Sequence, residues 1–285
     1  IILSLLIGCF QTQAKHRKIC LQDALDLKLV KAKAYSLGAY QGSCMTIKIK
    51  NLTKDSLIIL IEAGRKLNSL DDNYQDILIV KEELLGLRLS EEKSIKIKGY
   101  CCQANNRGPF SGLEYGLNKL ADTNLVKLAN YLNVNSFNQT TEQTAVWAIS
   151  DNRVTASITE INDSIALPLR QMVASIKREP IPWYKLLTKN FQYSTGQISN
   201  YPISLRGKLE YSNEKLNYAT LIIVNNKGIW TGQIKSFWLD PSIKNELDLN
   251  VSLKGFAKGK YSIPFLLKNG FKVEIENYQF GMVQK

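Results

Sequence analysis

The chain of 285 residues has a formal charge of +12, 22% charged residues and 45% hydrophobic residues. This composition is typical of a globular protein with one large or two ordinary domains. The only histidine, His16, excludes a Ser-His-Asp or Cys-His catalytic arrangement in the folded part and any histidine-rich metal site. Because the basic residues are spread along the chain and no C-x-x-C spacing occurs, we expect no nucleic-acid partner, no metal and no cofactor.

The first nine residues form an apolar run that ends at Cys9. A membrane span needs about 20 apolar residues, so this run indicates the hydrophobic part of an export signal, within a leader of residues 1–19. Leu6-Ile7-Gly8-Cys9 resembles a lipobox, which would leave a lipidated Cys9 attached to a membrane. Cleavage after Thr12-Gln13-Ala14 would instead remove Cys9. Both alternatives predict an exported protein, at the cell surface, as an outer-membrane lipoprotein or secreted.

Residues 43–102 alternate with a period of two, which predicts strands. Met45, Ile47 and Ile49 alternate with polar residues, and the continuous apolar runs at 56–61 and 77–80 are typical of buried strands. Glycines and polar clusters separate these segments. We therefore expect a β-rich unit, either a sandwich or a barrel.

After Pro109 the predicted period becomes helical. Asp122 is suited to cap a first helix, and Thr140 or Thr141 to cap a second. A third helix is expected to start near Pro168, because proline fits the first turn of a helix. The apolar positions of the first helix are Leu125, Leu128, Ala129 and Leu132. These helices predict an α+β domain over residues 20–178.

Residues 178–182, Arg-Glu-Pro-Ile-Pro, are the best candidate linker. Beyond it, strands are predicted at 203–211, 218–224, 228–234, 247–253, 260–267 and 271–280. Hairpin turns are expected at 225–228 and 268–270. Several short strands over about a hundred residues indicate an all-β, immunoglobulin-like sandwich, assigned to residues 183–285.

The segment from Gly99 to Asp151 holds the residues with the most distinctive chemistry. Cys101 ends a predicted strand, and Gln143 lies in the first turn of a predicted helix. If the strand alternates, Cys101 faces the core and Cys102 the wetter side, and a bulge at Gly99 would reverse this. A thiol and a carboxamide on separate rigid elements can form an internal thioester if an apolar pocket excludes water. Tyr100 and Trp147 are suited to wall such a pocket.

These residues resemble the bacterial surface thioester domains, the modules of covalent adhesins. Tyr100-Cys101 is similar to the family's cysteine motif, and Gln143-Thr144-Ala145-Val146-Trp147 to its T-Q-x-A-hydrophobic-W motif. The resemblance covers roughly residues 40–175 and implies covalent attachment to amine-bearing partners, with Gln143 as acyl donor and Cys101 as acyl carrier. Glu142 replaces the family's threonine, and Cys102 is a second candidate thiol.

A non-covalent alternative stays open. Cys101 and Cys102 are equally compatible with buried free thiols, or with a disulfide to Cys20 or Cys44 in an oxidising compartment. The protein would then be an exported binding or structural module. Neither alternative predicts an enzyme, because the sequence offers no general base with a matching nucleophile.

Overall fold

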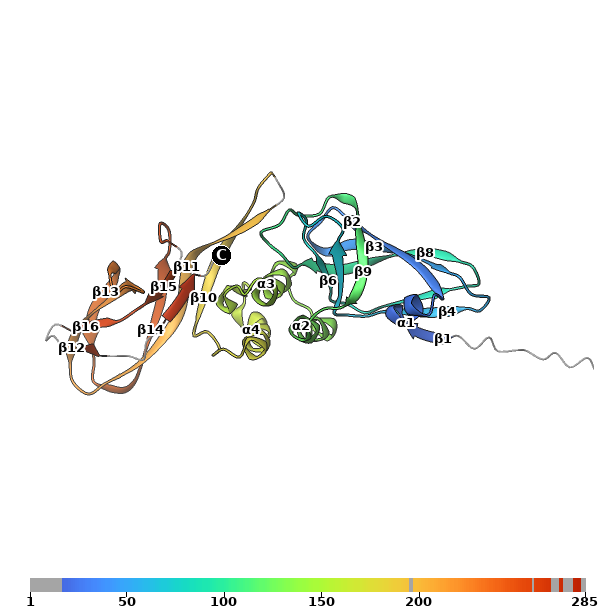
Figure 1. The fold of residues 1–285 in the computed structure, drawn as a ribbon. Coiled ribbons are helices and arrows are strands. Elements are labelled where there is room, and N and C mark those ends of the chain that lie inside the picture. The colour runs from blue at the N-terminus through green and yellow to red at the C-terminus, as the bar shows by residue number, and fades with distance from the viewer. Residues whose placement is uncertain (1–16, 195–196, 258, 268–271, 274–278, 283–285) are drawn as a thin grey trace, which may run out of the picture.

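The computed structural model describes residues 17–194, 197–257, 259–267, 272–273 and 279–282 (Figure 1). The protein is α+β and rich in strands, as predicted. A β-barrel region comes first, helices follow it, and antiparallel sheets make up the rest of the chain. Cys9, His16 and both candidate processing sites lie outside the described residues, as does the predicted turn at 268–270.

The N-terminal half is built around a closed barrel with the strand order β2-β3-β8-β6-β5-β9. Its strands are β2 (Val30–Leu37), β3 (Gln41–Asn51), β5 (Arg65–Ser69), β6 (Ile77–Ile79), β8 (Glu92–Cys101) and β9 (Ser111–Leu120). A smaller sheet contains β1 (Arg17–Cys20), β4 (Leu57–Ile61) and β7 (Glu83–Leu87), next to helix α1 (Leu21–Asp26). Because β1 pairs with β4 in parallel, three residues assigned to the leader belong to this sheet.

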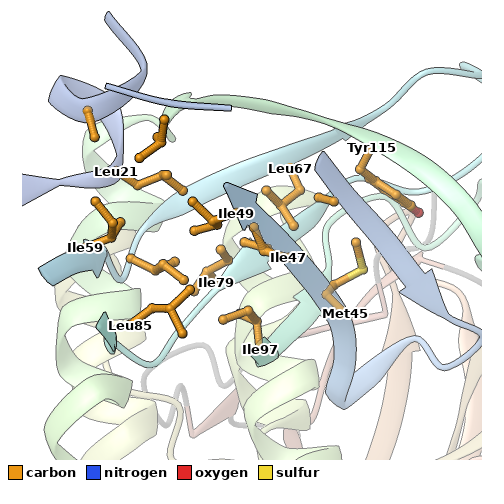
Figure 2. Packing of buried hydrophobic residues seen from close by; sticks show 14 of the residues in the cluster. Leu21, Met45, Ile47, Ile49, Ile59, Leu67, Ile79, Leu85, Ile97 and Tyr115 are labelled. Atoms are coloured by element: carbon orange, nitrogen blue, oxygen red, sulfur yellow. The ribbon is translucent and has the colours of Figure 1, made fainter. Parts of the chain in front are cut away.

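The alternating pattern of the sequence produces the barrel core. Met45, Ile47 and Ile49 of β3 are fully buried, while Lys48 and Lys50 between and beyond them are exposed. Figure 2 shows the apolar side chains meeting Ile97, Leu67 and Tyr115 from other strands. The continuous apolar run of β6 is buried at every position, since the barrel covers one face and the helices cover the other.

The strand β9 was not predicted. The sequence favoured a helical period after Pro109, but residues 111–120 instead pair with β2 and β5 and close the barrel. The alternation is visible once the partners are known, because Leu113, Tyr115 and Leu117 all pack against the barrel core. Gly112 before these residues and Gly116 among them weakened the signal.

Three helices lie between the barrel and the C-terminal sheets (Figure 1). They are α2 (Thr123–Val134), α3 (Gln139–Ser150) and α4 (Asp163–Lys177), with a 3-10 turn, η1 (Thr155–Ser157). Asp122 caps α2 as predicted. The predicted cap of α3 is wrong. Asn138 caps the helix, because its side chain accepts from the backbone N–H of Thr140, and the helix begins at Gln139, before the predicted caps.

The predicted start of the third helix is also wrong. Asn162 caps α4, and Pro168 lies inside the helix. A proline in this position removes one backbone hydrogen bond. The helix retains its apolar face, which buries Leu169 and Val173 against the other helices.

The C-terminal half consists of two antiparallel sheets around one apolar core. The first sheet contains β10 (Tyr184–Gln192), β11 (Ile198–Asn213) and β14 (Ser242–Ser252). The second contains β12 (Asn217–Asn225), β13 (Trp230–Leu239), β15 (Gly259–Ser262), β16 (Phe265–Leu267), β17 (Lys272–Val273) and β18 (Gln279–Met282). The turn at 225–228 is confirmed, with Gly228 at a φ of 73°. The single strand predicted at 260–267 is two strands, because Pro264 interrupts the pairing.

Among the described residues, several contacts join the two halves, including the ion pair between Lys185 Nζ of β10 and Asp163 Oδ2 of α4 at 3.4 Å. Ala156 of η1 packs into the core of the C-terminal sheets. The Gln197 side chain donates a hydrogen bond of 2.8 Å to the carbonyl of Asn105, in the loop that follows β8. The chain leaves α4 at Arg178, whose φ of 57° turns it away from the helix, and enters β10 at Tyr184.

Candidate functional site

The structure brings Cys101 and Gln143 together. The backbone N–H of Cys101 donates to Gln143 Oε1 at 3.1 Å, and Gln143 Nε2 donates to the Cys101 carbonyl at 2.8 Å. Cys101 ends β8 as predicted. Gln143 lies in the second turn of α3 and not in the first turn as predicted, because the helix begins at Gln139. Both side chains are almost completely buried, with 0% and 1% exposure.

The two neighbouring cysteines face opposite sides of β8. Cys101 belongs to the barrel core, and Cys102 belongs to the core between the barrel and the helices. The alternation therefore holds, and the register irregularity lies across from Gly99, between Gly42 and Met45 of β3. The expectation of a wetter environment for Cys102 is wrong, because the helices cover this face and leave it 2% exposed.

All four cysteines among the described residues are free thiols. Cys44 Sγ donates to the Gly99 carbonyl at 3.3 Å, close to the end of β8. Burial raises the pKa of the Cys44 thiol to about 12. Burial also raises the pKa of Cys101 well above its usual value, with Cys44 as a second cause, and it raises the pKa of Cys102. All three groups are neutral thiols at neutral pH.

Glu142, next to Gln143, is a fully buried carboxylate with three partners. Its Oε2 accepts from the Tyr100 hydroxyl at 2.5 Å and pairs with Lys98 Nζ at 2.7 Å. Its Oε1 accepts from the backbone N–H of Phe137 at 2.9 Å. Two consecutive residues of α3, Glu142 and Gln143, therefore bind two consecutive residues of β8, Tyr100 and Cys101. Burial and this hydrogen bond raise the pKa of Tyr100.

Trp147, one turn after Gln143, is also fully buried. Tyr40 stacks on its ring at a centroid distance of 6.2 Å, and the Arg153 guanidinium lies 4.6 Å from the ring centre. Ala104, in the loop after β8, packs against the same indole. The backbone N–H of Ala104 donates to Asp151 Oδ2 at 3.3 Å, and burial raises the pKa of Asp151.

Six predicted side chains lie at this contact between β8 and α3, together with several side chains that the sequence did not point to. Tyr100, Cys101, Cys102, Glu142, Gln143 and Trp147 all lie where β8 meets α3. Tyr40, Lys98, Asp151 and Arg153 were not named. Tyr40 is sixty residues from the nearest motif residue, and no local pattern marks it. Lys98 was visible only as one of several alternating lysines.

The described residues hold no group of three or more His, Cys, Asp and Glu side chains placed to bind a metal ion. None of the described helices is long and apolar enough to cross a membrane.

No family model matches the chain, and comparisons with curated proteins and with solved structures found no match. The resemblance to thioester domains therefore depends on the residues of this chain and on the contact between Cys101 and Gln143 alone.

Proposed function

We propose that the chain is an exported surface protein that attaches covalently to amine-bearing partners through an internal thioester between Cys101 and Gln143. One observation carries the proposal. The Gln143 carboxamide is bound to the Cys101 backbone through both of its polar atoms, in a buried site. The motif spacing in the sequence and the burial of both groups support the same assignment.

The proposed reaction forms the thioester from the Cys101 thiol and the Gln143 carboxamide. Cys101 Sγ attacks Gln143 Cδ, the thiol proton passes to the amide nitrogen, and ammonia leaves as the S–C bond forms. The Cys101 N–H already donates to the acyl oxygen, so it stabilises the negative charge that develops there. The Cys101 carbonyl holds the departing nitrogen. Reaction with an amine then forms an amide and returns the thiol.

Burial favours the thioester over the ionised thiol. A thiolate in this site would be desolvated, which is why the pKa of Cys101 is raised. A thioester sulfur carries no charge and loses nothing by burial. The same apolar surroundings, including Tyr100 and Trp147, exclude the water that would hydrolyse the bond. Glu142 anchors the helix that carries Gln143.

The remainder of the chain fits a surface protein. The proposal assigns the residues before β1 to a leader, with Cys9 as a lipid anchor at the cell surface or outer membrane, or with cleavage and secretion as the alternative. It assigns the chain from β1 to residue 178 to the thioester domain, because Arg17–Cys20 pairs within that unit, and residues 183–285 to an immunoglobulin-like sandwich that presents it. Two packed antiparallel sheets with a shared apolar core support the second assignment.

A non-covalent module is the second candidate, and the same hydrogen bonds favour it in part. The Gln143 carboxamide gives hydrogen-bond partners to the backbone N–H and C=O of Cys101, the last residue of β8, and this alone would stabilise the end of the strand. The cysteines would then be buried thiols, as the structure describes them. In this case Gln143 stabilises the fold and has no reaction.

Intact mass of the non-reduced protein separates the two candidates. We expect a mass short by one ammonia, which becomes an amine adduct after incubation with methylamine. Cys101→Ala and Gln143→Ala should both abolish the mass loss and the adduct. Cys20→Ala is the matched control, because this thiol lies outside the site. Cys102→Ala should leave the mass loss intact. The full expected mass in the unmodified protein would contradict the thioester and support the non-covalent module.

A further inference from the structure

Trp147 and Arg153 each carry a buried N–H group that has no acceptor. Trp147 Nε1 and Arg153 Nη1 are both shielded from solvent, and neither has a hydrogen-bond partner among the residues that the structure describes. Buried donors are nearly always paired in folded proteins, because an unpaired one loses its water without compensation. Two such donors on one stacked pair of side chains indicate an acceptor that the described chain does not supply.

The positive charge of Arg153 indicates that the missing acceptor is an anion. Arg153 takes part in none of the ion pairs found among the described residues. Burial lowers the pKa of its guanidinium, and the negative charge of Asp151 acts against this shift. Asp151 is engaged elsewhere, since its Oδ2 accepts from Ala104 N–H at 3.3 Å and from Ser150 Oγ at 3.2 Å. A guanidinium beside a neutral N–H donor suits a planar anion with two oxygen atoms, and a carboxylate is the common group of this kind.

The pair lies beside the candidate reactive residues. Trp147 follows Gln143 by one helical turn, and long helical side chains extend back over the preceding turn. The indole is fully buried, whereas Tyr40 and Arg153, which pack on its ring, are each partly exposed. Tyr40 and Arg153 are therefore the parts of this cluster that a ligand in solution contacts first.

We propose that Trp147 Nε1 and the Arg153 guanidinium form a carboxylate-binding site, and that this site selects amines that also carry a carboxylate. The binding of a carboxylate is independent of the reaction at Cys101. The selection among amines rests on the proposed thioester function. A partner recognised in this way presents an amino group and a carboxylate together, as the end of a peptide or an acidic side chain near a lysine does.

Binding is tested with hexanoate, which has no amine. In a nitrogen-15 spectrum of the indole groups, the Trp147 signal is assigned by its absence in Trp147→Phe. We expect hexanoate to shift this signal to saturation and hexanol to leave it in place. Arg153→Gln should abolish the shift, and Arg88→Gln, which removes the same charge from an exposed position, should retain it. No shift in the unmodified protein, or an equal shift in Arg153→Gln, would overturn the proposal.

Selection is tested by the ratio of two adduct rates, measured by intact mass with aminohexanoate and with the matching amino alcohol. One charge-assisted hydrogen bond predicts a preference for the carboxylate of about tenfold. The ratio should stay near ten in Arg88→Gln and fall to about one in Arg153→Gln. Equal rates in the unmodified protein would overturn the selection. A hexanoate shift without any adduct would contradict the thioester and leave the carboxylate site in place.

Discussion

The interiors of the two halves differ in chemistry. Every buried polar or charged side chain among the described residues lies before residue 171, whereas the buried core of the C-terminal sheets is apolar. These buried polar residues are Ser36, Asn51, Arg65, Gln75, Thr141, Glu142, Gln143, Thr144, Thr155 and Arg170. In the C-terminal half, the ion pairs Lys208–Glu246 and Lys244–Glu210 lie on the surface.

The difference shows where the fold bears the free-energy cost of burying polar side chains. Burying a polar group costs free energy unless its partners are placed well. Four of the buried polar residues are consecutive in α3, and only two of them reach across to β8. Thr144 bonds within the helix to the Thr140 carbonyl, and Thr141 bonds to the Thr159 carbonyl in the segment before α4. Glu142 and Gln143 bond to Tyr100 and Cys101. The contact between α3 and β8 is therefore where buried polar side chains link two elements of the N-terminal half, whereas the core of the C-terminal sheets is apolar.

Removing the Glu142 carboxylate is the largest expected effect. Glu142→Ala leaves Lys98, Tyr100 and the Phe137 N–H without their acceptor inside the protein. We expect the free energy of unfolding of the N-terminal half to fall by about 3–5 kcal/mol, measured by urea denaturation. Glu142→Gln should lose less, because it keeps an acceptor.

The matched control is Glu246→Ala, which breaks an exposed pair with Lys208 in the other half. Exposed pairs contribute little to stability, so we expect no measurable change. If Glu142→Ala and Glu246→Ala lowered the free energy of unfolding by the same amount, burial of the carboxylate would not be the reason for its importance.

The sequence predicted many of the strands and six side chains of the candidate site. Alternation at Met45, Ile47 and Ile49 and the apolar run at 57–61 needed no knowledge of their partners, since each pattern is complete within one strand. The motif around Gln143 and the cysteine at the end of β8 were likewise local. The structure places these two segments in contact over 42 residues of chain.

What the sequence missed depends on distant partners. The strand β9 closes the barrel between β2 and β5, and the glycines between its inward residues hid the alternation. The cap of α3 was misplaced because several polar residues in a row could each cap a helix, and Asn138 does so. The start of α4 was misplaced because Pro168 suits a first turn, whereas Asn162 caps the helix and the proline lies inside it. Tyr40 reaches Trp147 from a turn between strands, which only the closed barrel determines.

Alkaline pH should act on the N-terminal half alone through its thiols, since all cysteines lie at or before position 102. The pKa of Cys44 is raised from 9.0 in the unfolded chain to about 12 in the fold. Its contribution is therefore fully present below pH 9.0 and is lost as the pH rises towards about 12. Between about pH 8 and pH 10 this single thiol should lower the free energy of unfolding by about 1.4 kcal/mol.

Urea denaturation of the unmodified protein and of Cys44→Ala at the two pH values measures this loss. The variant should show a smaller decrease by the stated amount, because it has no thiol to ionise at this position. Cys101 and Cys102 have pKa values raised in the same direction and would add to the loss wherever they are free. An identical pH dependence in the two proteins would show that Cys44 ionises equally in the folded and unfolded states.

The smallest expected effect concerns an exposed polar contact of the N-terminal half. Asp122 Oδ1 accepts from the backbone N–H groups of Asn124 and Leu125 at 2.9 and 3.2 Å. Asp122→Ala should cost about 1 kcal/mol, the usual value of a helix cap, and Asp122→Asn should restore most of it. Urea denaturation gives both values. A loss as large as that of Glu142→Ala would mean that burial does not determine how much a polar residue contributes to stability. A small loss that asparagine reverses would show that the buried contact between α3 and β8 contributes more than an exposed helix cap.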